Sequence, residues 1–205
     1  MSQPQPQVCS RCGRRLGPDS RWRHTAKGVY CQPCLNSLWR AKGYAAERDL
    51  VKKLRRLGYS ALRMAVSGAG EESIPDVIAF KQPSGPALAF EVKAVTAQRW
   101  TVYAYKEKDG QKKEGQILKC LRFIDEMYPE TMERKAGVAI KFLLGERRKS
   151  PWVIKWVPFP SDRDFSKVEN ITVDVADVSG FPELTASSRS KRSRRLVRRR
   201  LKGKR

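Results

Sequence analysis

Residues 73–93, "SIPDVIAFKQPSGPALAFEVK", hold two short apolar runs that flank a turn-forming segment. Runs of this length and composition, separated by Pro, Ser and Gly, predict two antiparallel strands joined by a turn. A type I turn centred between Pro83 and Ser84 places Asp76 directly opposite Glu91. The hairpin therefore predicts an acidic pair at one end of an otherwise apolar sheet.

Side chains alternate across a strand, so Lys93 shares a face with Asp76 and Glu91. Opposed carboxylates repel and are costly to desolvate. A divalent cation removes both costs, and Mg²⁺ prefers one or two carboxylates together with water and phosphate oxygens. Lys93 could hold an attacking water or stabilise charge that develops on a phosphate. The alternative is a solvated strand end with an ion pair between Asp76 and Lys93, and the pattern leaves both open.

A third acid lies in the segment "AAERDLVKKLRRLGY", whose apolar spacing predicts a helix that stops at Gly58. Glu47 precedes Leu50 and Val51 by three and four residues, so it lies on the buried stripe of this helix. A carboxylate there needs a partner, or it is a first-turn acid favoured by the helix dipole. The residues alone leave these two interpretations open.

The remaining pattern predicts a mixed α/β domain over residues 42–160. Strands are expected at "ALRMAV", "DVIAF", "ALAFEVKAV", "TVYAY", "GVAIKFLL" and "WVIKWVPF", with a second helix over about 114–128. An extension, 161–186, offers one edge strand in "NITVDVADV". We therefore expect a mixed sheet flanked by helices.

The composition is strongly basic, because 43 Lys and Arg residues face 21 Asp and Glu residues and give a net charge of +22. Such an excess predicts a polyanionic partner, with nucleic acid first. No apolar run approaches the length of a membrane-spanning helix and no secretory signal follows Met1. We expect a cytoplasmic, nucleoid-associated protein with no membrane partner and no small-molecule substrate; a cellular or viral origin stays open.

Two CxxC pairs, "CSRC" and "CQPC", are separated by 18 residues. In an intracellular chain this spacing predicts a structural Zn²⁺ site of four thiolates within a module over residues 8–40, after a disordered segment 1–7. An iron or redox site is the alternative. The expected ligands are Cys9, Cys12, Cys31 and Cys34.

Basic side chains cluster in this module and again at the end of the chain. In the module they either contact phosphate and unpaired bases, with Trp22 among them, or form a solvated loop. The module's cluster consists of Arg14, Arg15, Arg21 and Arg23. Residues 187–205 contain 11 Lys and Arg residues and no acid, which predicts a disordered tail that binds phosphates without sequence preference. A localisation or solubility signal is the alternative. The tail's expected DNA-binding residues are Arg194, Arg195, Arg198, Arg199 and Arg200.

The order of Glu47, "SG" at Ser67, "PD" at Asp76 and "EVK" at 91–93 resembles the PD-(D/E)xK nuclease superfamily. Longer segments, "ERDLVKKLRRLGYSALRMAVSG", "IPDVIAF", "FEVKAV" and "VIKWVPF", resemble archaeal Holliday junction resolvases in the same order over about residues 42–160. The resemblance implies a restriction-endonuclease-like sheet. The cysteine module and the basic tail lie outside it.

This resemblance also implies a homodimeric endonuclease that needs Mg²⁺, with Mn²⁺ as a substitute, and that cuts four-way DNA junctions. Its expected metal ligands are Glu47, Asp76 and Glu91, with Lys93 as the catalytic lysine. Ser67 would be an active-site loop residue, Arg48 and Arg63 would contact the DNA backbone, and Gln116 or Gln111 would be an active-site glutamine. Another nuclease of the superfamily, with repair, restriction or transposon substrates, and a non-catalytic architectural DNA-binding protein are the alternatives.

Overall fold

The computed structural model describes residues 7–17, 20–64, 74–81, 85–108, 110–144 and 150–177. The chain divides into two compact units, Met1–Ala45 and Ala46–Arg205. The boundary falls inside helix α1 (Gln32–Arg56). The sequence analysis predicts a helix in "AAERDLVKKLRRLGY", and the structure extends this helix without a break back to Gln32, directly after Cys31.

The first unit is a β-hairpin followed by the start of α1. Strand β1 (Trp22–Thr25) pairs antiparallel with β2 (Gly28–Cys31). Gly28 has a φ of +128°, and a Cβ there would lie 2.4 Å from Ser10 Oγ, so the turn requires glycine. A small core contains Cys9, Leu16 and Cys31.

The second unit is built on a five-stranded mixed sheet in the order β10-β9-β5-β4-β3. All neighbouring pairs are antiparallel except β5 and β9, which are parallel. The chain between them contains α2, as a parallel pair requires a crossover connection. The elements are β3 (Ser60–Arg63), β4 (Val77–Phe80), β5 (Ala87–Val95), α2 (Gln116–Met127), β9 (Arg134–Phe142) and β10 (Trp152–Val157).

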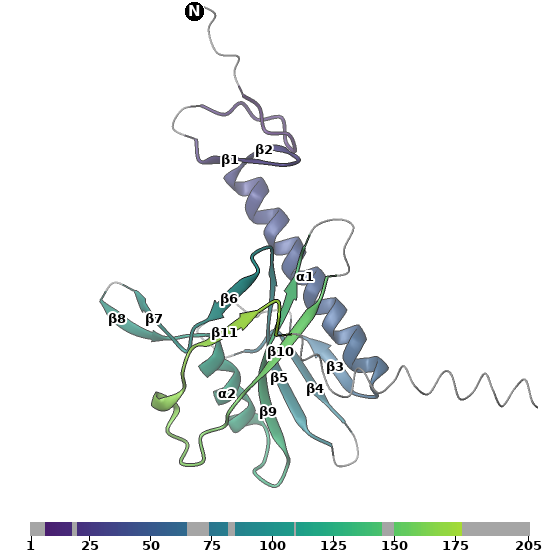
Figure 1. Cartoon of the computed structure of the whole chain (residues 1–205), viewed down its shortest axis with the longest axis vertical. Coiled ribbons are helices and arrows are strands. Elements are labelled where there is room, and N and C mark those ends of the chain that lie inside the picture. Colours follow the sequence, from purple (N-terminus) through teal and green to yellow (C-terminus); the bar gives the residue numbers. More distant parts are fainter. Residues whose placement is uncertain are drawn as a thin grey trace, which may run out of the picture. The chain divides into compact units, whose positions relative to one another are not determined.

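Alternating side chains give the sheet two apolar faces, and each face packs against one helix (Figure 1). Leu50 and Leu54 in the second half of α1 pack with Val77, Leu88 and Phe90. On the other face, α2 buries a stripe of apolar side chains against β5 and β9; this stripe consists of Ile117, Leu118, Cys120 and Leu121. The predicted mixed sheet flanked by helices is confirmed.

Helix α1 ends where the sequence predicts. Gly58 has a φ of +87°, and the backbone N–H of Tyr59 donates to the carbonyl of Leu54 at 3.1 Å. A glycine in this left-handed conformation is a common helix terminator. The helix therefore passes directly into β3.

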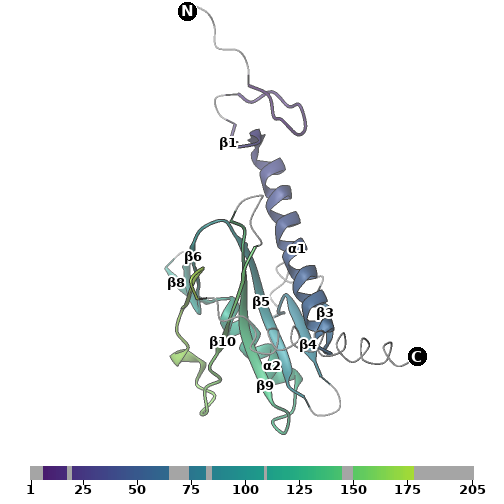
Figure 2. The same cartoon turned by 45° about the vertical axis from the view of Figure 1, so that its right-hand side comes forward.

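Two further strand pairs belong to the second unit. Strand β6 (Arg99–Val102) pairs with β11 (Ile171–Asp174), and β7 (Tyr105–Lys108) pairs with β8 (Gln111–Glu114). A short 3₁₀ helix, Phe165–Lys167, precedes β11. Figure 2 shows β6, β8 and β11 on the side of the sheet away from α1. The predicted edge strand in "NITVDVADV" therefore exists, but it pairs with β6 in a sheet of its own.

The prediction of a single strand at "TVYAY" is wrong, because Tyr103 and Ala104 interrupt it between β6 and β7. The backbone N–H of Ala104 donates to Asn170 Oδ1 at 2.9 Å, and its carbonyl accepts from Gly115 N at 2.6 Å. Both backbone groups of Ala104 are thus engaged outside any strand. No helix in the described ranges is both long enough and apolar enough to cross a membrane.

Candidate functional site

The register of β4 and β5 brings Asp76 opposite Glu91. Val77 pairs with Phe90, so Asp76, immediately before β4, faces Glu91 on β5. Asp76 N donates to the carbonyl of Phe90 at 3.0 Å, and the amide of Val92 donates to Asp76 Oδ2 at 2.8 Å. The register predicted from the turn is confirmed, and the Asp76 carboxylate is fixed by the backbone of β5.

The acidic pair is shielded from water. Asp76 is 8% exposed, Glu91 is 3% exposed and Glu47 is 6% exposed, and these are the buried charged residues of the described chain. Ionised groups are seldom buried without a partner. Lys93, partly buried two residues after Glu91, donates from Nζ to Glu91 Oε1. The alternative ion pair between Asp76 and Lys93 is therefore not the one that forms.

The environment shifts the pKa of Glu91 and Lys93. Burial raises the pKa of Glu91 to about 7; the charge of Lys93 opposes this shift and the charge of Asp76 adds to it. For Lys93, burial pulls the pKa down, but the charges of Glu91 and Asp76 outweigh it and raise the pKa above its ordinary value. When both acids are ionised, the two carboxylates carry more negative charge than Lys93 neutralises. A bound cation would neutralise the remainder.

Glu47 is paired with an arginine and not with this cluster. Arg63 Nη1 donates to Glu47 Oε2 at 2.9 Å, and Arg63 is the strand partner of Val77, next to Asp76. Within the described ranges, the only group of three or more potential ligands close enough to share an ion is the set of four cysteines. The structure thus brings Asp76, Glu91 and Lys93 together, whereas Glu47 is paired with Arg63.

The other expected site residues are distributed as follows. Arg48 is exposed on α1, Gln116 is partly buried at the start of α2, and Gln111 is exposed at the start of β8. Ser67 and the tail residues Arg194, Arg195, Arg198, Arg199 and Arg200 lie outside the described residues. The roles proposed for all of them stay predictions.

Cys120 is a neighbour of the acidic pair that the sequence did not indicate. It is fully buried on α2, and burial raises its pKa well above the ordinary value, with the charges of Glu91 and Asp76 adding to the rise. In the sequence it is one apolar-stripe residue among several, so only the packing of α2 on the sheet reveals it. Gln116 lies one helical turn before Cys120, on the same side of α2.

The four cysteines of the first unit form a second site. Their sulfur atoms all lie within 4.8 Å of one another, and Cys12 Sγ is 3.8 Å from Cys31 Sγ. A tetrahedral ion with Zn–S bonds of about 2.3 Å places its sulfurs about 3.8 Å apart. The amide of Cys31 donates to Cys9 Sγ at 3.4 Å and lowers the pKa of Cys9 to about 6. The thiolate form is thus favoured at Cys9, whereas the hydrogen bond with the Cys31 side chain raises the pKa of Cys34 to about 12. The four sulfur donors and their spacing fit the ion.

Two compact units are therefore defined: a four-cysteine module, and a mixed α/β domain with a buried cluster of two acids and a lysine. Residues 39–125, which include Glu47, Asp76, Glu91 and Lys93, match the family model described as archaeal Holliday junction resolvase (hjc). The predicted resemblance to that family is confirmed over this segment.

Two individual proteins are also similar to this chain. Crossover junction endodeoxyribonuclease Hje of Sulfolobus acidocaldarius is 33% identical over 100 residues, 49% of this chain and 61% of the relative's own length. The solved structure of Hjc, a Holliday junction resolvase from Archaeoglobus fulgidus, is 23% identical with a TM-score of 0.44, and the match covers 69% of this chain and 96% of that one. The chain thus spans about three fifths of the curated relative.

Proposed function

We propose that this protein is a Mg²⁺-dependent endonuclease that hydrolyses backbone phosphodiesters in four-way DNA junctions. The observation that carries the proposal is the buried, opposed pair of Asp76 and Glu91 with Lys93 bonded to Glu91. The family match over residues 39–125 and the name of the Sulfolobus relative support DNA crossovers as the substrate class.

Asp76 and Glu91 would hold the metal, because hard cations prefer carboxylate oxygens. When bound, Mg²⁺ would polarise the scissile phosphate and lower the pKa of the attacking water. The Val92 amide orients the Asp76 carboxylate, and Lys93 orients that of Glu91. The Lys93 ammonium also supplies positive charge where the phosphate gains negative charge in the transition state.

Glu47 would act as the third metal ligand by leaving Arg63 and binding the metal. Its carboxylate is bonded to Arg63, one strand from Asp76. DNA phosphate is a competing anion for the same guanidinium. In this proposal, substrate binding draws Arg63 onto the backbone and releases Glu47 toward the metal.

Gln116 is the better candidate for the active-site glutamine. It lies one turn before Cys120, whose thiol experiences the charges of Glu91 and Asp76, whereas Gln111 belongs to the exposed β7–β8 hairpin. A homodimer would present two sites to the two-fold symmetry of a junction. Exposed Arg48 and the basic tail would hold the DNA backbone, and Zn²⁺ on the four cysteines would be structural.

The test is cleavage of a labelled four-way junction beside matched duplex, flap and single strand, with Mg²⁺ and without it. We expect paired nicks in the junction, and only when Mg²⁺ is present. The variant Asp76→Asn should lose cleavage but still bind the junction. Asp162→Asn changes an exposed acid by the same charge and should cleave normally.

Each contrary outcome has a distinct meaning. Equal cleavage of all four substrates would contradict junction selectivity and leave another nuclease of the superfamily. Binding without cleavage under every condition would favour an architectural role. Full activity of Asp76→Asn would remove the proposed metal site.

A further inference from the structure

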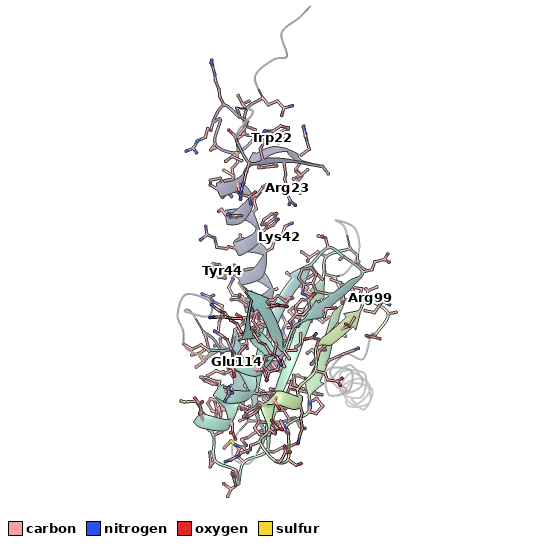
Figure 3. The ribbon with its side chains drawn as sticks, turned by 90° about the vertical axis from the view of Figure 1, so that its left-hand side faces the viewer. Trp22, Arg23, Lys42, Tyr44, Arg99 and Glu114 are labelled. Carbon is pink, nitrogen blue, oxygen red and sulfur yellow. The ribbon has the colours of Figure 1, made fainter. Side chains whose placement is uncertain are left out.

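The first unit exposes an aromatic and basic surface that the proposed nuclease chemistry does not use. Trp39, on α1 within this unit, is 46% exposed although it is the largest apolar side chain type. Arg23 on β1 places its guanidinium carbon 5.9 Å from the centre of the Trp39 ring, within the range of a cation–π contact. Arg23 projects from the hairpin in Figure 3.

The exposed tryptophan is not the one that the sequence favours. Trp22 is half-buried, packs against the small core of the unit and meets His24 edge-on at 5.1 Å between ring centres. Trp39, in contrast, follows buried Leu35 by one helical turn, and Gly43 one turn later has no side chain to cover it. The Trp22 ring is therefore part of the core of the unit, whereas the Trp39 ring is exposed to solvent.

The charge of the unit indicates what binds there. Residues 1–45 contain eight Lys and Arg residues and a single acid, Asp19. Even a zinc ion held by four thiolates, which is negative overall, leaves an excess of positive charge. A partner with both anionic groups and flat apolar faces matches such a surface, and single-stranded nucleic acid combines phosphates with unpaired bases.

We propose that Trp39 and Arg23 form a stacking site for an unpaired base, with the flanking phosphates held by neighbouring basic residues such as Arg40 and Lys42. Base stacking on an aromatic ring tolerates any sequence, because every base has a π-face. Arg23 already lies over the indole of Trp39. A bound base either inserts between the guanidinium and the indole, or replaces the guanidinium, which then contacts the adjacent phosphate. The site gives the protein an affinity for unpaired strands that is separate from the acidic cluster.

The experiment measures equilibrium binding of the full chain without Mg²⁺, so that its result does not depend on the nuclease proposal. The probes are a fluorescein-labelled thymidine 15-mer, its uridine counterpart, an abasic strand with the same phosphates, and a blunt duplex. We expect Trp39→Ala to weaken binding of a base-containing strand by about 5- to 150-fold, the range for loss of one stacked base. Binding of the abasic strand and of the duplex should change less than twofold.

Three controls separate stacking from folding and charge. Trp39→Phe keeps a ring and should recover most of the affinity. Trp100→Ala removes a tryptophan that is similarly exposed, at 41%, in the other unit, and should bind normally. Zinc content and circular dichroism should be unchanged in Trp39→Ala.

Several results would overturn the proposal: unchanged binding by Trp39→Ala, an equal loss for the abasic strand, or an equal loss in Trp100→Ala. A failure of Trp39→Phe to restore affinity would also contradict it. The thymidine and uridine probes identify the source of the bases, because the 2′-hydroxyl distinguishes RNA from DNA at a given site.

Discussion

Glu91 lies between a lysine and an aspartate where water hardly reaches. Its pKa of about 7 means that the folded protein takes up a proton here that the unfolded chain would release. The positive charge of Lys93 reduces the rise in the pKa of Glu91 without removing it. A metal ion that replaces the proton would therefore bind in competition with it.

The first prediction concerns stability of the metal-free protein against pH. Glu91 has a folded pKa raised from 4.5 to about 7, so its contribution to the free energy of unfolding is present below pH 4.5 and is lost as the pH rises to 7. Between pH 4 and pH 8 the loss should be on the order of 3 kcal/mol relative to Glu91→Gln, which cannot ionise. Urea unfolding of both proteins across this range measures the difference.

Glu126→Gln is the matched control, because Glu126 is an exposed acid on α2. The pH dependence of Glu91→Gln should exceed that of Glu126→Gln. Equal pH dependence in the two variants would mean that burial does not control the ionisation of Glu91.

At the scale of elements, the approach of α2 to the β6–β7 segment depends on one glycine. A Cβ on Gly115 would lie 2.0 Å from the carbonyl oxygen of Tyr103 and 2.9 Å from that of Ala104. The conformation of Gly115 is extended, so the restriction is steric and not conformational. The glycine allows α2 to begin close to the backbone that it contacts.

The second prediction is that Gly115→Ala destabilises the protein by about 1–3 kcal/mol, because the backbone must move to admit the methyl group. Gly17→Ala serves as the control, since its nearest contact would be Ser20 Oγ at 3.7 Å. Thermal unfolding of the two variants measures the effect. Equal stabilities would show that this segment yields easily.

Elements with strong local patterns could be predicted from the sequence. Two-residue periodicity and turn chemistry were sufficient for the register of β4 and β5, and the apolar stripe was sufficient for α2. The split between β6 and β7 was not predictable, because Asn170, far along the chain, takes the hydrogen bond that a continuous strand would use. The β7–β8 hairpin has few apolar residues and therefore no buried face to mark it.

The candidate site likewise contains residues that the sequence predicts and contacts that it does not. Asp76, Glu91 and Lys93 follow from strand alternation, and the four cysteines follow from their spacing. The pairing of Glu47 with Arg63 depends on how α1 packs across β3, and the place of Cys120 depends on how α2 packs on β5. Such contacts between distant segments leave no local signal in a single sequence.

At the scale of the whole molecule, each unit depends on a different source of stability. The α/β domain buries two apolar faces of a sheet, whereas the first unit has a core of Cys9, Leu16 and Cys31 with a few partly buried neighbours. Units this small seldom fold on hydrophobic burial alone. Metal is the expected source of the missing stability.

The third prediction is that the purified protein contains about one Zn²⁺ per chain, and that Cys31→Ser lacks it. Removal of one thiolate opens the tetrahedral site and should expose residues 8–31 to proteases, since binding energy of the metal is folding energy of the module. Cys120→Ala is the control, because this buried cysteine lies in the other unit and should leave the zinc content unchanged. Elemental analysis and limited proteolysis report the two effects; zinc retained in Cys31→Ser would contradict the assignment.

The parallel pairing of β5 with β9 has a consequence for the order of folding. Strands β4 and β5 are separated by residues 81–86 only, whereas β5 and β9 are separated by residues 96–133. Closing a long loop costs more chain entropy than closing a short one, and non-local pairing slows folding. We expect the hairpin with Asp76 and Glu91 to form early, and the strand that completes the centre of the sheet to join late. During synthesis and refolding, the acids would meet while still in water, before α2 and β9 seal them from it.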